Sequence, residues 1–141
     1  MSQIEMKHPH EWRLIGEVMV TFTIEGELSD QLYVDQFLGD LKKSQAEVIF
    51  SLATGSNSIT ASQRKAAADV MKSKNLKAII LTDSRVTRGV LTAVAWLGGN
   101  VVGFPWDQID RAVAATGASP QVQEQIVAYA NEFKNKWVKN Q

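Results

Sequence analysis

The sequence VIFSLA at residues 48–53 decides the fold, because it is short, apolar and rich in β-branched and aromatic side chains. Such a run predicts a strand that is buried on both faces, as strands of parallel sheets are. Two similar runs follow, AIIL at residues 78–81 and VVGF at residues 101–104. Helical patterns separate the three runs, and this alternation predicts a mainly parallel sheet with helices packed against it.

Upstream, apolar and polar residues alternate at period two from about residue 11 to residue 29. Gly16 and Glu17 interrupt the alternation, which predicts a hairpin turn between two strands. Alternation of this kind is typical of strands with one buried face. The apolar members are Trp12, Leu14, Val18, Val20, Phe22 and Ile24.

Helical patterns fill the rest of the chain. Ser29 is suited to cap a helix over residues 29–43, and Thr60 with Gln63 has the spacing of a capping box for a helix that ends near Asn75. The other helices are expected at residues 85–98, 106–115 and 119–139. The predicted fold is therefore α/β, with a mostly parallel five-stranded sheet, an N-terminal hairpin and about five helices.

Length and composition indicate one globular domain over residues 1–141, with 45% hydrophobic and 21% charged residues. The 15 Lys and Arg balance the 15 Asp and Glu, whereas nucleic-acid-binding domains usually carry a basic excess. The chain has no cysteine, which excludes disulfides and thiol catalysis. It also lacks an apolar run of about 18 residues and an N-terminal secretion signal, so we expect a cytoplasmic protein without a membrane span.

The chain has two histidines, His8 and His10, near its N-terminus. Two imidazoles could help to bind a metal ion, but no third ligand is evident, and chain ends are often disordered. A Ser-His-Asp relay would have to take its base from this same segment. We therefore expect no metal site, no cofactor and no enzymatic activity.

The polar loop after residues 48–53 lies where parallel sheets usually place function. Its candidate residues are Ser56, Asn57, Ser58 and Thr60. Three interpretations of this loop stay open. In the first, its hydroxyls cap the following helix. In the second, the loop binds a partner or accepts a phosphate, and in the third, its free amides hold a nucleotide. The loop lacks the glycine pattern of known phosphate-binding motifs, which disfavours the nucleotide.

The helix expected at residues 85–98 offers two further candidates. Arg85 and Arg88 lie one turn apart near its start, and two guanidiniums so placed could bind an anion, although solvated surface arginines are commoner. Leu91 and Trp96 lie off its main apolar stripe, so this helix is covered on a second side. The last helix or a second copy of the chain would supply that cover.

The last helix carries an apolar stripe and ends in three lysines. Docking on the domain's own sheet or on a sister subunit is favoured over a membrane surface, because so few lysines attract anionic lipid weakly. The stripe consists of Val122, Ile126, Ala130, Phe133 and Trp137.

In this order of elements the chain resembles the STAS superfamily, typified by bacterial anti-sigma-factor antagonists, and particularly its STAS/SEC14-like branch. The resemblance covers residues 12–116 and leaves the last helix outside. It lies in the Gly26-Glu27-Leu28 triplet after the hairpin, the strand at residues 48–53, and the strand and helix at residues 79–97. The strand that ends at Pro105 and the short helix with Asp107 and Ala112 complete it.

The resemblance implies a non-enzymatic module that binds a protein partner and is switched by phosphorylation at an Asp-Ser-Gly or Asp-Thr-Gly motif. The nearest match is Asn57-Ser58, without the acid and the glycine, and Ser56, Thr60 and Ser62 are alternatives. We expect such a partner-binding module, and we expect it to self-associate as a homo-oligomer. The alternative is a carrier or sensor of a small apolar ligand or lipid, held between the sheet and its outer helices.

Overall fold

Five strands form one sheet, and their order in the sheet follows their order in the chain. The computed structural model describes residues 4–55, 59–83 and 98–138. The first two strands are antiparallel and every later neighbour is parallel, which confirms the predicted α/β fold with its hairpin. The strands are β1 (His10–Ile15), β2 (Val18–Thr23), β3 (Val48–Ala53), β4 (Lys77–Leu81) and β5 (Asn100–Phe104).

The hairpin between β1 and β2 turns at Gly16, as predicted. Gly16 has φ +58°, a conformation that a glycine adopts without the penalty other residues meet. The prediction of one buried face was wrong for β2, whose residues are buried on both faces from Val18 to Phe22. On the edge strand β1, Leu14 is 39% exposed although it was predicted to be buried. The two strands differ in burial because β1 is at the edge of the sheet, whereas β2 lies inside the sheet between two layers of helices.

Helices connect and follow the strands close to the predicted positions. The Thr60–Gln63 capping box is present, and Asn75 ends the helix in the left-handed conformation at φ 54°. The predicted helix at residues 85–98 lies outside the described residues. The described elements are η1 (Gln31–Leu38), α1 (Gly39–Lys43), α2 (Ala61–Lys74), η2 (Trp106–Gln108), α4 (Ile109–Ala114), α5 (Pro120–Phe133) and η3 (Lys134–Val138).

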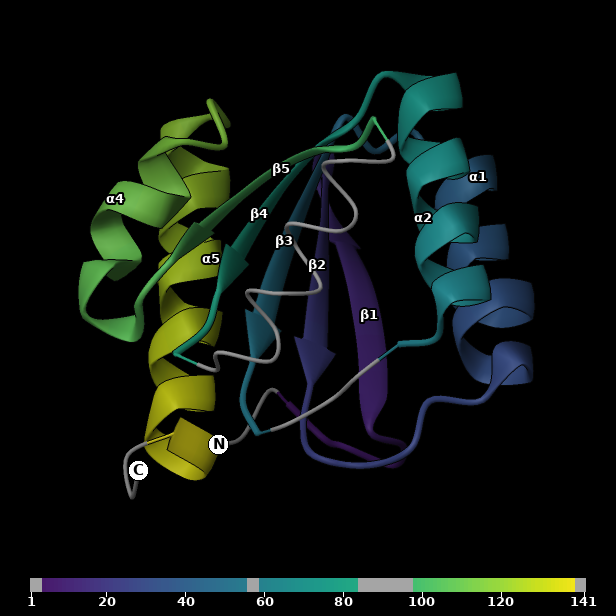
Figure 1. The fold of residues 1–141 in the computed structure, drawn as a ribbon. Helices are drawn as coiled ribbons and strands as arrows, with labels where there is room; N and C mark the ends of the chain where they lie inside the picture. Colours follow the sequence, from purple (N-terminus) through teal and green to yellow (C-terminus); the bar gives the residue numbers. More distant parts are fainter. Residues whose placement is uncertain (1–3, 56–58, 84–97, 139–141) are drawn as a thin grey trace.

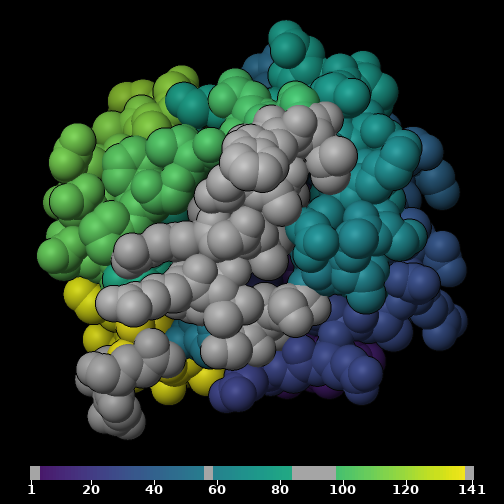
Figure 2. Space-filling view, viewed as in Figure 1, coloured from purple at the N-terminus to yellow at the C-terminus, as the bar shows by residue number. Residues whose placement is uncertain are grey.

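The helices lie in two layers on opposite faces of the sheet (Figure 1). Crossovers between parallel strands are almost always right-handed, so connections that step across the sheet in one direction fall on one face. This explains why the η1–α1 segment and α2 share a face, whereas α4 and α5 cover the other. In the space-filling view, α2 and the η1–α1 segment form one flank of the molecule and α4 lies on the opposite flank (Figure 2).

Each face of the sheet has its own apolar core. The α2 face is the one that carries Met19, Ile49 and Ala78, and the α5 face is the one that carries Val20, Phe50 and Ile79. Residues from η1, α1 and α2 pack on the α2 face, namely Phe37, Leu38, Leu41, Ala67, Ala68, Val70 and Met71. Helices α4 and α5 close the α5 face with Ala112, Val113, Ile126, Tyr129, Ala130 and Phe133.

Helix α5 docks on the domain's own sheet, which confirms one of the predicted alternatives. Ile126, Ala130 and Phe133 are fully buried there. The ring of Phe133 stacks on Trp106 with 5.6 Å between the centroids and 10° between the planes. The indole of Trp106 in turn donates a hydrogen bond to the carbonyl of Ala53 at 2.9 Å. The last helix, outside the family resemblance, is thus part of the core.

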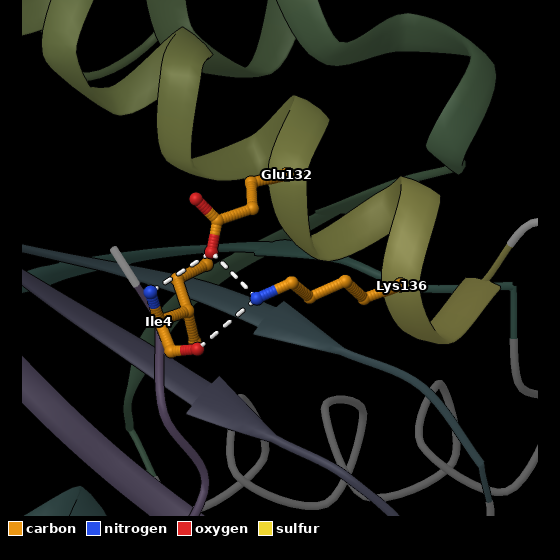
Figure 3. Close-up of polar contacts among 3 residues, drawn as sticks. All are labelled: Ile4, Glu132 and Lys136. Atoms are coloured by element: carbon orange, nitrogen blue, oxygen red, sulfur yellow. Dashed lines mark hydrogen bonds and ion pairs between the residues drawn. The ribbon is translucent and has the colours of Figure 1, made fainter. Parts of the chain in front are cut away.

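The segment before β1 is held against the end of α5 (Figure 3). The backbone amide of Ile4 donates to the Glu132 carboxylate at 2.8 Å. The ammonium group of Lys136 donates to the same carboxylate at 3.2 Å and to the carbonyl of Ile4 at 3.3 Å. The Ile4 side chain is buried in the core of the α5 face. Together these contacts position the chain that leads into His10.

Replacement of Phe133 by Ala should reduce the free energy of unfolding by about 3–5 kcal/mol, because it leaves a cavity under Trp106. Gln125→Ala, an exposed position on the same helix, is the control and should change stability by less than about 0.5 kcal/mol. Urea denaturation monitored by circular dichroism measures both. A loss below about 1 kcal/mol for Phe133→Ala would mean that α5 is not part of the cooperative core.

Candidate functional site

A cavity of about 130 Å³ lies on the α2 face of the sheet, between the strands and the layer formed by η1, α1 and α2. It runs from the carboxyl ends of β2 and β3 toward the interior of the sheet. Its strand side is lined by His10, Thr21, Thr23, Ile49, Ser51, Ala53, Ala78, Ile80 and Val101. Its helix and loop side is lined by Leu28, Tyr33, Phe37, Leu38, Leu41, Ile59, Ala67 and Met71.

Alanines are the smallest side chains in the cavity wall. They are Ala53, Ala67 and Ala78. Protein interiors are otherwise close-packed, so an apolar cavity of this size beside the core is an uncommon feature.

The cavity wall is almost entirely apolar, and none of its described residues is charged. Thr21 and Ser51 lie side by side on its floor, where the Thr21 hydroxyl donates to Ser51 Oγ at 2.8 Å. This bond joins neighbouring positions of β2 and β3, which the strand register pairs. Because these hydroxyls satisfy one another, they add little polarity to the cavity.

His10 is the exception in this wall. Its ring is only 4% exposed, and Nδ1 lies 2.8 Å from the Thr23 hydroxyl, with which it shares a hydrogen bond. The other ring nitrogen, Nε2, is buried and has no hydrogen-bond partner within the described part of the chain. A buried polar atom without a partner costs free energy, which makes it a notable feature of a native core.

Aromatic rings surround the His10 imidazole. The Phe37 ring meets it edge to face at 4.6 Å between centroids, and Tyr33 and Trp12 lie at 5.6 and 5.7 Å. Burial among these rings lowers the pKa of His10 to about 4, because the charged form loses its hydration. Burial likewise raises the pKa of Tyr33 to about 12. Both groups are therefore uncharged at neutral pH.

The expectation that the histidine segment is disordered was wrong for His10. His8 is exposed, and its backbone amide donates to Glu11 Oε2, whereas the His10 side chain is buried in the sheet. The two imidazoles thus differ in environment, and the part of the chain that the structure describes holds no cluster of three metal-binding side chains. A sequence signal for His10 existed, since it continues the period-two series of Trp12 and Leu14 by one step.

The predicted loop is described only at its two ends, and Ser56, Asn57 and Ser58 lie outside the described residues. Thr60 caps α2, since its hydroxyl oxygen accepts from the amide of Gln63 at 3.0 Å. The Gln63 side chain completes the capping box and also donates to the Leu28 carbonyl and to Asp30 Oδ1 at 3.0 and 2.8 Å. Thr60 therefore helps to hold α2 against the segment that leads into η1, at one end of the cavity.

The other predicted site residues, Arg85, Arg88, Leu91 and Trp96, also lie outside the described residues. Just before them, the Asp83 carboxylate accepts a hydrogen bond from the backbone amide of Trp106 at 3.2 Å. This bond joins the end of β4 to the start of η2.

Comparison with protein-family models, with curated proteins and with solved structures found no match for this chain. Within the described residues, no helix combines the length and apolar character needed to cross a membrane. The fold and the site together define an α/β protein with an apolar cavity on one face of its sheet.

Substitution of Thr60 by Ala should cost about 1 kcal/mol of stability, because the first turn of α2 loses its side-chain cap. Thr60→Ser keeps the accepting oxygen and should retain most of that stability. Ser62→Ala, at an exposed position in the same turn, is the matched control. Equal losses for Thr60→Ala and Ser62→Ala in urea denaturation would contradict the capping role.

The buried His10 should make stability depend on pH. Its pKa is about 4 in the folded chain and about 6.5 when unfolded, so between these values the unfolded chain binds a proton that the folded chain does not. Stability should therefore be complete above pH 6.5 and fall as the pH drops toward 4, by at most about 1.4 kcal/mol per pH unit.

His10→Phe should remove this part of the pH dependence and leave the part due to carboxylates. Urea denaturation of both proteins at several pH values from 4 to 7.5 measures the difference in slope. His8→Phe is the control and should behave like the unmodified chain. Parallel curves for His10→Phe and the unmodified chain would show that His10 is not buried in its neutral form.

Proposed function

We propose that this protein binds a small, largely apolar molecule in the cavity on the α2 face. The observation that carries the proposal is the cavity of about 130 Å³ with a largely apolar wall, which the buried His10 helps to line. Ligand sites are typically concave and apolar, with a few polar groups that fix the orientation of the ligand. Ligand sites also lie near the carboxyl ends of parallel strands. The wall of this cavity includes Thr23 and Ala53, the last residues of β2 and β3.

The size of the cavity sets the size of the ligand. An engineered cavity of about 150 Å³ lined by apolar side chains binds benzene. At about 130 Å³, the cavity of this chain suits a molecule with a single small ring or a short hydrocarbon chain. The wall residues that the structure describes include no Lys, Arg, Asp or Glu, and this favours a ligand without a full charge, because a buried charge needs a partner. Binding without chemical conversion is the simplest role for such a wall.

The STAS-like partner-binding module is the second proposal that the family resemblance supports. Its phosphorylation switch would use Ser58, with Ser56, Thr60 and Ser62 as alternatives, and its self-association would use Leu91 and Trp96. Of the four loop candidates, the structure describes Thr60, which is engaged as a helix cap. We place ligand binding first because the described residues supply geometry for it.

Filling the cavity should abolish binding without unfolding the protein. Ala67→Leu adds three carbon atoms to a side chain that lines the cavity, so the variant should bind toluene at least tenfold more weakly. Its stability should stay within about 1 kcal/mol of the unmodified chain, because the added atoms enter existing space rather than a packed core. Isothermal titration calorimetry with toluene and urea denaturation measure the two quantities.

Ala61→Leu makes the same change at an exposed position of the same helix and is the matched control. It should leave toluene binding unchanged. Native mass spectrometry of the unmodified protein tests for a ligand retained from the host cell, which Ala67→Leu should lack. Toluene binding that is equal in the two variants, or absent from the unmodified chain, would refute the proposed function.

A further inference from the structure

The strand residues that line the cavity follow a diagonal across the sheet, and this shape indicates the class of ligand, an inference that rests on the proposed function. We infer that the preferred ligand is an unbranched alkyl chain, which lies along this diagonal from the carboxyl end of β2 toward the amino end of β4. The juxtaposition that carries the inference is a set of three neighbouring rows of residues, each shifted by one strand from the row before it.

Strand pairing defines the three rows of the cavity floor. Among the described residues of β1 and β2, Trp12 and Met19 continue the second and third rows, but neither lines the cavity. The cavity is therefore a diagonal channel. From the carboxyl end inward, the rows are His10, Thr23 and Ala53 on β1 to β3, then Thr21, Ser51 and Ile80 on β2 to β4, and last Ile49, Ala78 and Val101 on β3 to β5.

The helix layer covers the channel along its length. Helix α2 follows β3 and precedes the parallel β4, so it runs from the carboxyl end of the strands back to their amino end. Its wall residues Ala67 and Met71 are four positions apart and lie on one face of the helix. Tyr33, Phe37 and Leu41 have the same spacing along η1 and α1. The described roof thus extends in the direction of the rows.

The dimensions of the channel favour a chain over a ring. The wall residues of β3 extend from Ile49 to Ala53, about 13 Å along the strand. The middle of the row shifts by two strands, from β2 to β4, which adds about 10 Å across the sheet and gives a length of about 16 Å. At a volume of about 130 Å³ the channel is narrow. A single ring fills part of this length, whereas an alkyl chain buries apolar surface along all of it.

The distribution of polar groups gives the chain its direction. The rings of His10 and Tyr33, which are 5.6 Å apart, belong to the wall at the carboxyl end. In the middle row, the hydroxyls of Thr21 and Ser51 bond to one another. The innermost row is apolar, with Ala78 at its centre. A polar head group of the ligand therefore lies at the carboxyl end, and the methyl end of the chain lies near Ala78.

The length and shape of alcohols test the inference on the unmodified chain. Isothermal titration calorimetry gives the Kd of 1-butanol, 1-hexanol and 1-octanol, which differ only in their number of CH₂ groups. We expect the Kd to fall about fourfold for each added CH₂, because each is buried in the channel. Cyclohexanol carries the carbon atoms and the hydroxyl of 1-hexanol in a ring. After correction for the partition of both alcohols between water and octanol, it should bind about tenfold more weakly, because a ring leaves part of the channel empty.

A variant shortens the channel from its inner end. Ala78→Leu adds three carbon atoms in the innermost row. It should weaken the binding of 1-octanol by about tenfold or more and that of 1-butanol by less than about threefold, because only the longer chain reaches this row. Ala114→Leu makes the same change at an exposed position of α4, on the opposite face, and should leave both Kd values unchanged. Circular dichroism shows whether each variant is folded.

Three results would overturn the inference while toluene binding upholds the proposed function. In the first, 1-octanol binds no more tightly than 1-butanol to the unmodified chain. In the second, cyclohexanol equals 1-hexanol after the correction for partition. In the third, a folded Ala78→Leu loses both alcohols equally, which indicates a single chamber rather than a channel. If Ala78→Leu does not fold, the alcohols on the unmodified chain decide the matter. Failure of toluene and of every alcohol to bind would refute the proposed function itself.

Discussion

The structure depends on a directional constraint: the parallel strands are added one beside the next, always in the same direction across the sheet. Right-handed crossovers then bring η1, α1 and α2 to a single face. The opposite face would expose Val20, Phe50 and Ile79, and the chain covers it with α4 and α5 after the last strand. The topology therefore explains why the C-terminal helix is part of the core.

The two faces of the sheet are packed differently, and the difference has a functional consequence. On the α5 face, large side chains such as Phe133 and Trp106 stack and fill the space. On the α2 face a cavity remains, and Ala67 of α2 and Ala78 of β4 are among the residues that line it. A stable core on one side can offset the free energy that an unfilled space and an unpartnered nitrogen cost on the other. The packing of the α5 face thus supports the site, although the site itself lies on the α2 face.

Much of this arrangement could be predicted from particular residues. The run at residues 48–53 became β3 with the predicted bounds, and the Thr60–Gln63 pair formed its capping box, because both depend on local sequence alone. The burial of β2 on both faces could not be predicted in that way. The alternating pattern predicts that the polar Thr21 faces solvent. Thr21 is buried instead, because Ser51 of the neighbouring strand supplies a hydrogen-bond partner.

The amino-acid sequence by itself determined the α/β class, the hairpin and the helix ends, since periodicity, caps and glycine turns act over a few residues. It also excluded cysteine chemistry. Only the tertiary structure decided that His10 is buried, that its Nε2 has no hydrogen-bond partner among the described residues, and that Ala67 and Ala78 line a cavity. These properties depend on which residues from distant segments meet, and on how much space their side chains leave. Such information resides in the packing of the chain rather than in any local pattern.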